Sequence, residues 1–256
     1  MIRPMLPIGD ENERGHGPAF VSLAFIGLNI AVFLLLQAAG GPSGEDFTYG
    51  YSAVPFEITH GVDLVGPREI TVGGTPVVIP QEPGPYPIWL TLLTSMFMHG
   101  GLLHLGGNML FLWIFGDNVE HRIGHIPFLA FYLVAGVIAS FAQILVSTDS
   151  VIPTLGASGA ISGVLGAYLV MFPANRVTVL FLRFPMQVPA IVAIGLWAVL
   201  QFVSGIGALG VEESGGGVAY MAHIGGFVAG VVAGLAFRAI YHEPRHPRGT
   251  PAAAYR

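Results

Sequence analysis

The 256-residue chain contains no cysteine and no lysine, and charged residues make up only 10% of it. Without cysteine it can form no disulfide, no thiolate metal site and no thiolate nucleophile, so any covalent catalysis must use another side chain. Its ten basic residues are all arginines, and no run of them is long enough to follow a phosphate backbone. We therefore expect no nucleic-acid partner.

Apolar residues take the place of the missing charges. Hydrophobic residues make up 53% of the chain, and its mean hydropathy is +0.70. A water-soluble domain could not carry so much apolar surface, so most of this chain must lie in a lipid bilayer. We predict one integral membrane domain.

Six apolar segments are candidates for transmembrane helices, which need about 20 apolar residues to cross ~30 Å of hydrocarbon. The sequence thus predicts an all-α membrane protein with a six-helix bundle. The six segments are Ala19–Ala39, Leu102–Gly116, Pro127–Val146, Gly156–Phe172, Val188–Gly207 and Ala219–Tyr241.

A long first extracytoplasmic loop, about residues 40–101, separates the first two predicted spans. Its early part is rich in Gly and Pro and too polar to cross a membrane. The stretch ITVGGTPVVIP predicts a short hairpin. The apolar stretch Ile88–Met98 stops at His99, which favours a re-entrant or interfacial helix.

The arginines predict the orientation, because short cytoplasmic loops carry the positive excess. With the N-terminus inside, nine of the ten arginines are cytoplasmic and only Arg68 lies outside. We predict a cytoplasmic segment over residues 1–18, a membrane domain over 19–241 and a cytoplasmic tail over 242–256. A bacterial plasma membrane is the expected location.

Four polar residues lie where apolar ones are expected, namely His104, Asn108, Ser158 and His223. Ionisable groups inside a membrane are expensive and often functional. Each of the four lies in the first two turns of a predicted helix, and these three helices run in the same direction. Shared depth therefore suggests one site.

Small residues four apart predict that two of these helices pack closely. The sixth span carries such a stripe in Gly226, Gly230 and Gly234, and the fourth carries Gly159, Gly163 and Ala167. Packing the stripes together would make Ser158 and His223 neighbours, so that the imidazole could accept the serine proton as in a Ser-His dyad. A lone membrane histidine is more often structural, and a Gly-x-Ser-Gly tetrapeptide alone is weak support.

The i, i+4 spacing of His104 and Asn108 places both side chains on one helix face, where they could together donate to a developing oxyanion. Two polar residues with this spacing in a membrane helix often serve only to form hydrogen bonds to a neighbouring helix.

Taken together, the motifs resemble those of the rhomboid family of intramembrane serine proteases. Residues 99–108 look like the family's H-x4-H-x3-N element, residues 156–159 like its GxSG, and residues 222–230 like its AHxxGxxxG, in family order. The resemblance covers about residues 19–241.

The resemblance implies a peptidase that cuts transmembrane protein substrates near their extracytoplasmic end, without metal or cofactor. It implies Ser158 as nucleophile and His223 as general base, with an oxyanion hole formed by His104, Asn108 and the Ser158 amide. The implied structural residues are His99, Gly156, Gly159, Gly226, Gly230, Glu120 and Arg122.

Two features depart from the family pattern. Ser162 stands where some members carry an aromatic residue that stacks on the histidine, so the ring must be positioned from elsewhere. The first loop is long and lacks the family's Trp-Arg pair.

A catalytically silent relative that binds transmembrane helices is the main alternative. A transporter or a metalloprotease is disfavoured, because the chain shows neither two similar halves nor H-E-x-x-H. The oligomeric state stays open.

Overall fold

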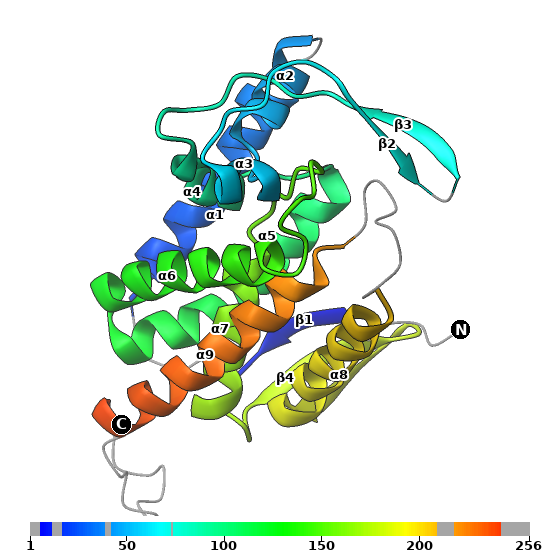
Figure 1. Ribbon diagram of the computed structural model, residues 1–256. Coiled ribbons are helices and arrows are strands. Elements are labelled where there is room, and N and C mark those ends of the chain that lie inside the picture. The colour runs from blue at the N-terminus through cyan, green and yellow to red at the C-terminus, as the bar shows by residue number, and fades with distance from the viewer. Residues whose placement is uncertain (1–5, 12–16, 39–41, 73, 209–217, 242–256) are drawn as a thin grey trace, which may run out of the picture.

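The computed structural model describes residues 6–11, 17–38, 42–72, 74–208 and 218–241, which form a mostly helical structure (Figure 1). Its long helices correspond to the predicted apolar segments. They are α1 Phe20–Val32 with its continuation Phe33–Gln37, α5 Leu102–Ile123, α6 His125–Ile144, α7 Ser158–Met171, α8 Ala190–Ala208 and α9 Tyr220–Ile240.

Four helices are long and apolar enough to cross a membrane, over Phe20–Gln37, His125–Ile144, Ala190–Gly207 and Tyr220–Ile240. A fifth span is possible if Ile88–Phe97 and α5 count as one broken segment, since they meet at 80°. Helix α7 is apolar but has only 14 residues. The chain is thus a multi-pass membrane protein with four or five candidate spans by length, and the count of six remains a prediction.

Helix α7 owes its central position to its small residues. Its residues from Gly159 to Tyr168 are all buried. A side chain on Gly226 or Gly230 of α9 would collide with the backbone carbonyl oxygens of Gly159 and Gly163, respectively. The predicted contact of the two stripes is therefore confirmed, and it sets the distance between the helices that carry Ser158 and His223.

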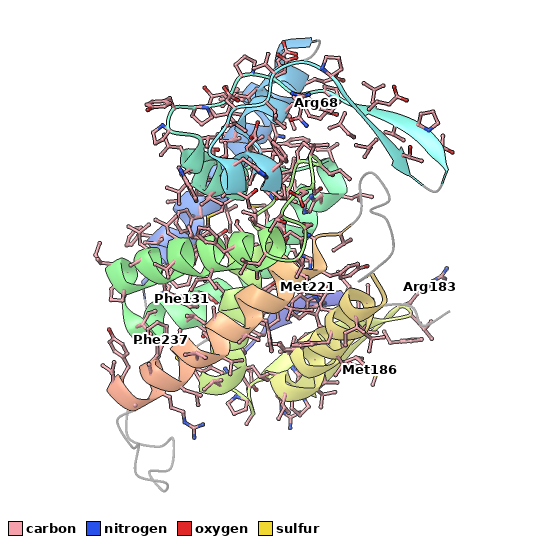
Figure 2. The ribbon with its side chains drawn as sticks, in the orientation of Figure 1. Arg68, Phe131, Arg183, Met186, Met221 and Phe237 are labelled. Atoms are coloured by element: carbon pink, nitrogen blue, oxygen red, sulfur yellow. The ribbon has the colours of Figure 1, made fainter. Side chains whose placement is uncertain are left out.

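Aromatic side chains fill the space between the helices farther from these close contacts. Phe131 of α6 and Phe237 of α9 meet edge to face, with ring centroids 5.3 Å apart (Figure 2). Such edge-to-face pairs are a favoured aromatic geometry. They hold α6 against the C-terminal half of α9, where the glycine stripe ends.

The structure is mostly helical, as predicted, but it also contains strands that an all-α protein would lack. A three-stranded antiparallel sheet in the order β1-β4-β5 joins part of the predicted N-terminal segment to the connection between α7 and α8. Val177 and Val179 are buried while Thr178 and Leu180, which alternate with them, are not, so the strand has the two-residue period of a half-buried sheet. Strands of five or six residues are too short to stand out in the sequence beside the apolar helices. The strands are β1 Leu6–Asp10, β4 Arg176–Phe181 and β5 Phe184–Pro189.

This sheet is tied to the bundle through Asp10. Its carboxylate accepts hydrogen bonds from the Tyr168 hydroxyl at 2.6 Å and the Asn118 amide at 2.7 Å. Burial, with Asp117 and Glu11 nearby, raises the pKa of Asp10 to about 6, against the effect of its hydrogen bonds. Because β5 leads directly into α8, the sheet anchors the start of that helix (Figure 1). Arg183 lies in its β4-β5 turn (Figure 2).

The first loop is folded rather than extended, and its helices and hairpin gather at one end of the bundle (Figure 1). The predicted hairpin is confirmed, with Arg68 paired to Ile79 at its open end. The predicted re-entrant segment consists of short helices. The loop elements are α2 Pro42–Tyr51, α3 Pro55–His60, β2 Arg68–Val72, β3 Thr75–Ile79, Ile88–Leu90, α4 Thr91–Thr94 and Ser95–Phe97.

The first loop also holds the segment that leads into α7. Ala53 pairs with Thr154 in an antiparallel bridge, the Gln81 amide donates to the Val151 carbonyl at 2.7 Å, and the Gly156 N–H donates to the Ser95 carbonyl at 2.9 Å. These bonds fix the backbone immediately before Ser158.

Within this loop Glu57 is buried and accepts a hydrogen bond from the Leu64 N–H at 2.8 Å. Burial, together with the charge of Asp63, raises the pKa of Glu57 to about 7. Removal of a carboxylate from water disfavours its ionised form, so the loop has a built-in sensitivity to pH.

Candidate active site

Ser158 is the first residue of α7, and its position depends on the glycine two residues before it. Gly156 has a φ of 131°, which disfavours any residue with a side chain. A Cβ there would also lie 2.9 Å from Cε1 and 3.0 Å from Nε2 of His104. Gly156 therefore lets the chain turn sharply and brings the His104 ring beside Ser158.

The structure brings Ser158 and His223 together from α7 and α9. The Nε2 atom of His223 lies 2.8 Å from the Ser158 hydroxyl oxygen, within hydrogen-bonding distance. The other ring nitrogen, Nδ1, lies 2.7 Å from the side-chain oxygen of Gln201 on α8. A base in contact with a hydroxyl and oriented by a further group is the arrangement of an activated nucleophile.

Two further side chains from α5 supply polar groups to the same region. The Gly100 N–H donates to Nδ1 of His104 at 3.3 Å, so Nδ1 is the unprotonated nitrogen and Nε2 carries the hydrogen. That Nε2 lies beside Gly156, 3.0 Å from where a Cβ of this residue would be. Asn108 is buried, and its Nδ2 has no hydrogen-bond partner among the described residues. Both side chains can therefore offer a donor to a bound oxygen.

His99 links the first loop to the first helix through its backbone. Its N–H donates to Oε1 of Gln37 at 2.9 Å, and its carbonyl accepts from Nε2 of the same side chain at 3.2 Å. Its ring is buried edge-to-face against His104, with centroids 5.1 Å apart. In this position the His99 ring packs against His104.

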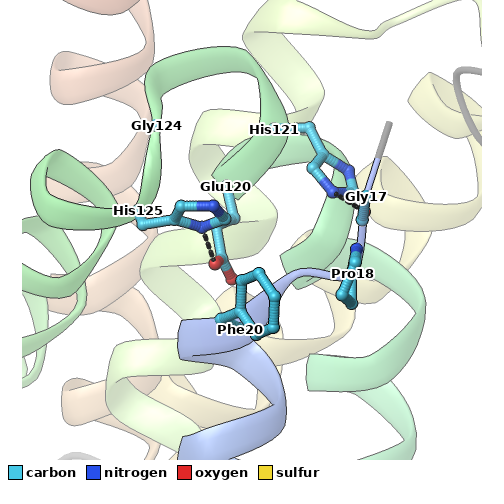
Figure 3. A pocket seen from close by; sticks show the side chains of 7 residues that line it. All are labelled: Gly17, Pro18, Phe20, Glu120, His121, Gly124 and His125. Carbon is cyan, nitrogen blue, oxygen red and sulfur yellow. Dashed lines mark hydrogen bonds and ion pairs between the residues drawn. The ribbon is translucent and has the colours of Figure 1, made fainter. Parts of the chain in front are cut away.

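Glu120 and Arg122 lie near the far end of α5, and Glu120 lines a pocket at the α5-α6 turn (Figure 3). The Glu120 carboxylate accepts from the backbone N–H groups of Val21 and Ser22 at 2.8 Å each and contacts Nδ1 of His125 at 2.5 Å. The Arg122 guanidinium lies 4.6 Å from the Phe172 ring centroid. Glu120 thus satisfies the start of α1, where backbone donors have no helical partner.

Gln201 was not among the site residues predicted from the sequence, and no residue was predicted to position the His223 ring. A polar residue in the middle of an apolar segment is the same signal that singled out His104 and Asn108, so Gln201 could have been selected from the sequence in the same way. The orientation of α8 about its own axis could not be predicted from the sequence, and this orientation decides whether Gln201 faces lipid or His223. Among the described residues, no group of three His, Asp or Glu side chains is placed to hold a metal ion.

Comparison with known proteins assigns the family. Residues 87–240 match the Rhomboid domain model, which covers more than half of the chain, so the chain belongs to the rhomboid family. It is 32% identical over 219 residues to Rhomboid protease GluP of Bacillus subtilis, covering 86% of this chain. It is 33% identical over 149 residues to Rhomboid protein 1, mitochondrial, of Saccharomyces cerevisiae, and 30% identical over 238 residues to RHOMBOID-like protein 4 of Arabidopsis thaliana, covering 57% and 87% of this chain.

These curated relatives are longer proteins. The chain spans 35%, 41% and 55% of their respective lengths. The matched region includes the helices that carry His104, Asn108, Ser158 and His223. Family membership therefore applies to the membrane domain in which the candidate site lies.

Proposed function

We propose that this protein is an intramembrane serine endopeptidase that uses Ser158 as nucleophile and His223 as general base. The observation that carries the proposal is the 2.8 Å contact between Nε2 of His223 and the Ser158 hydroxyl oxygen. Membership in the rhomboid family supports the assignment, since one matched relative is named a protease.

The proposed reaction begins when the Ser158 oxygen attacks a peptide carbonyl carbon and its proton passes to Nε2 of His223. The protonated imidazole then gives that proton to the leaving amine as the carbon–nitrogen bond breaks. Water hydrolyses the acyl-enzyme in a second step, with His223 again accepting a proton. No metal or cofactor takes part in this scheme.

The proposed oxyanion hole uses three donors, namely Nε2–H of His104, Nδ2–H of Asn108 and the N–H of Ser158. The unpartnered Asn108 amide supports this role, because a buried donor without a partner is destabilising unless a ligand satisfies it. The N–H of Ser158 also fits, since the first N–H groups of a helix have no intrahelical acceptor. Donors aimed at developing negative charge contribute much of the rate of acyl transfer.

The proposed substrates are transmembrane segments of other proteins, cut near their extracytoplasmic ends. The site lies at the N-terminal end of α7, beneath the folded first loop. In the six-span arrangement with both termini in the cytoplasm, that end faces outward. The bacterial plasma membrane remains our prediction for the location, while the named relatives come from a bacterium and from eukaryotes, one of them mitochondrial by name.

The structural residues of the site are proposed to act through packing. Gly156 admits His104, Gly159 and Gly226 set the distance between α7 and α9 beside the dyad, and Gly230 continues this contact. His99 backs His104, while Glu120 and Arg122 stabilise the opposite end of α5.

Cleavage of a single-span reporter in liposomes tests the proposal. We expect wild-type protein to cut it and Ser158→Ala and His223→Ala to lose at least about a thousandfold in rate while remaining folded. A fluorophosphonate should label Ser158 in the wild type only. Undiminished cleavage by Ser158→Ala would refute the assignment of the nucleophile. A wild type that neither cuts nor reacts would favour the catalytically silent relative that binds transmembrane helices.

A further inference from the structure

The imidazole of His223 has two hydrogen-bonding contacts, and only one of them belongs to the proposed dyad. The second joins Nδ1 to Oε1 of Gln201 at 2.7 Å. Gln201 lies on α8, whereas Ser158 and His223 lie on α7 and α9. The contact therefore brings a third helix into the site.

This contact determines which ring nitrogen carries the hydrogen. The side-chain oxygen of a glutamine can only accept, so Nδ1 of His223 must donate to it. A neutral imidazole has one N–H, which leaves Nε2 with a free lone pair facing the Ser158 hydroxyl. That tautomer can take a proton from serine, and the opposite tautomer cannot.

Helix α8 also restricts the ring through Trp197, one turn before Gln201. The centroids of the Trp197 and His223 rings are 6.2 Å apart, with a 38° angle between their planes, and Trp197 also lies 6.0 Å from the Phe227 ring. Ser162 gives the imidazole no such support, because its hydroxyl donates to the Ser158 carbonyl at 2.6 Å. Orientation of the base therefore comes from α8.

We propose that Gln201 is a positioning residue that selects the Nδ1–H tautomer of His223 and aims Nε2 at Ser158. The inference rests on the proposed function, because it gives a role to the base of that reaction. Gln201 is uncharged, so it orients the imidazole without the attraction that a carboxylate would exert on the protonated ring. Correct positioning of α8 is then a condition for an active base.

The test compares wild-type protein with Gln201→Leu, Gln201→Glu and the charge control Gln187→Glu, which lies on the exposed strand β5. Cleavage of the liposome reporter is measured as kcat and KM across pH, and fluorophosphonate labelling as a rate. We expect Gln201→Leu to lower kcat and the labelling rate about tenfold or more with KM unchanged, because Nδ1 loses its acceptor.

We expect Gln201→Glu to move the acid limb of the kcat/KM profile upward by about one pH unit, because a carboxylate beside Nδ1 stabilises the protonated imidazole. Gln187→Glu should leave the profile unchanged. His104 also interacts electrostatically with His223, and it is the same in every variant. An unchanged pH profile in Gln201→Glu would show that residue 201 does not face Nδ1 of His223.

Nitrogen NMR of histidine-labelled, inhibitor-free protein reads the tautomer without reference to activity. We expect the His223 signals of the wild type to show hydrogen on Nδ1 and those of Gln201→Leu to show a mixture. Wild-type kcat, pH profile and tautomer in both Gln201 variants would overturn the role of Gln201 while leaving the dyad intact. If the proposed function itself is wrong, the wild-type protein will neither cut the reporter nor react with the fluorophosphonate.

Discussion

The contact between Gly230 and Gly163 predicts how strongly the site depends on the distance between α7 and α9. A Cβ placed on Gly230 would lie 2.6 Å from the carbonyl carbon and 2.8 Å from the Cα of Gly163, and closer still to its oxygen. Ordinary contact begins at 3.4 Å, and backbone atoms cannot rotate aside. Clearing the carbonyl carbon alone requires about 0.8 Å, so Gly230→Ala must push the two backbones apart by more than roughly 0.8 Å to clear the oxygen as well.

Two opposing effects set the loss of stability. Overpacking of this kind costs about 1–3 kcal/mol, while alanine gains up to about 1 kcal/mol over glycine within a helix. We expect a net loss of about 1–2 kcal/mol in the free energy of unfolding. Gly230 lies about two turns from His223 on the same helix, so part of the displacement reaches the dyad.

The effect on activity should exceed the effect on stability. A misplacement of about 1 Å at a reacting group costs on the order of a hundredfold, so a partial displacement should lower kcat about tenfold. Thermal unfolding in detergent and reporter cleavage in liposomes measure the two effects separately. Gly230→Leu should worsen both.

Gly195→Ala on α8 is the matched control, because a Cβ there meets no atom within 4 Å. It should keep full activity and unfold at the same or a higher temperature. Wild-type stability and activity in Gly230→Ala would refute the packing argument, and equal losses in both variants would indicate a general effect of removing helix glycines.

Three further predictions concern the oxyanion hole, the first loop and the sheet. Asn108→Ala should lower kcat about a hundredfold with little change in KM, because the donor acts mainly in the transition state. The pKa of Glu57 is raised in the folded protein, so between about pH 4.5 and pH 7 the folded protein keeps a proton on Glu57 that the unfolded chain releases. The free energy of unfolding should therefore fall by up to about 3 kcal/mol as pH rises from about 4.5 to about 7. Glu57→Gln should abolish this fall. Tyr168→Phe should cost about 1–3 kcal/mol above pH 6, because it removes the hydroxyl that donates to the carboxylate of β1.

Each of these predictions has a control within the chain. Asn29→Ala removes a buried amide remote from the dyad in sequence, and it should affect stability rather than kcat. Glu69→Gln, on the exposed hairpin, should leave the pH dependence of unfolding unchanged. Tyr132→Phe should be neutral or stabilising, because the Tyr132 hydroxyl is buried without a partner among the described residues. Equal effects of a variant and its control would contradict the corresponding argument.

The sequence by itself determined the environment of the chain, the approximate positions of its helices and the set of residues to examine. Long apolar segments reveal membrane helices because hydrocarbon must satisfy every backbone group within the helix. The glycine stripes predicted which helices touch, because only small residues allow backbones to meet. Polar residues at equal depth then predicted that Ser158 and His223 would lie together.

Only the tertiary structure showed the β-sheet, which is built from short segments, and the contact of Gln201 with His223, which depends on the rotation of a helix. Strand β1 is separated from β4 by most of the chain, and each of the three strands is so short that it shows only a weak alternation of apolar and polar residues. The arginine tally also includes residues near both termini that lie outside the described part of the chain. The contact of Gln201 with His223 depends on how α8 is turned about its axis, and a uniformly apolar helix carries no amphipathic pattern from which that rotation could be predicted.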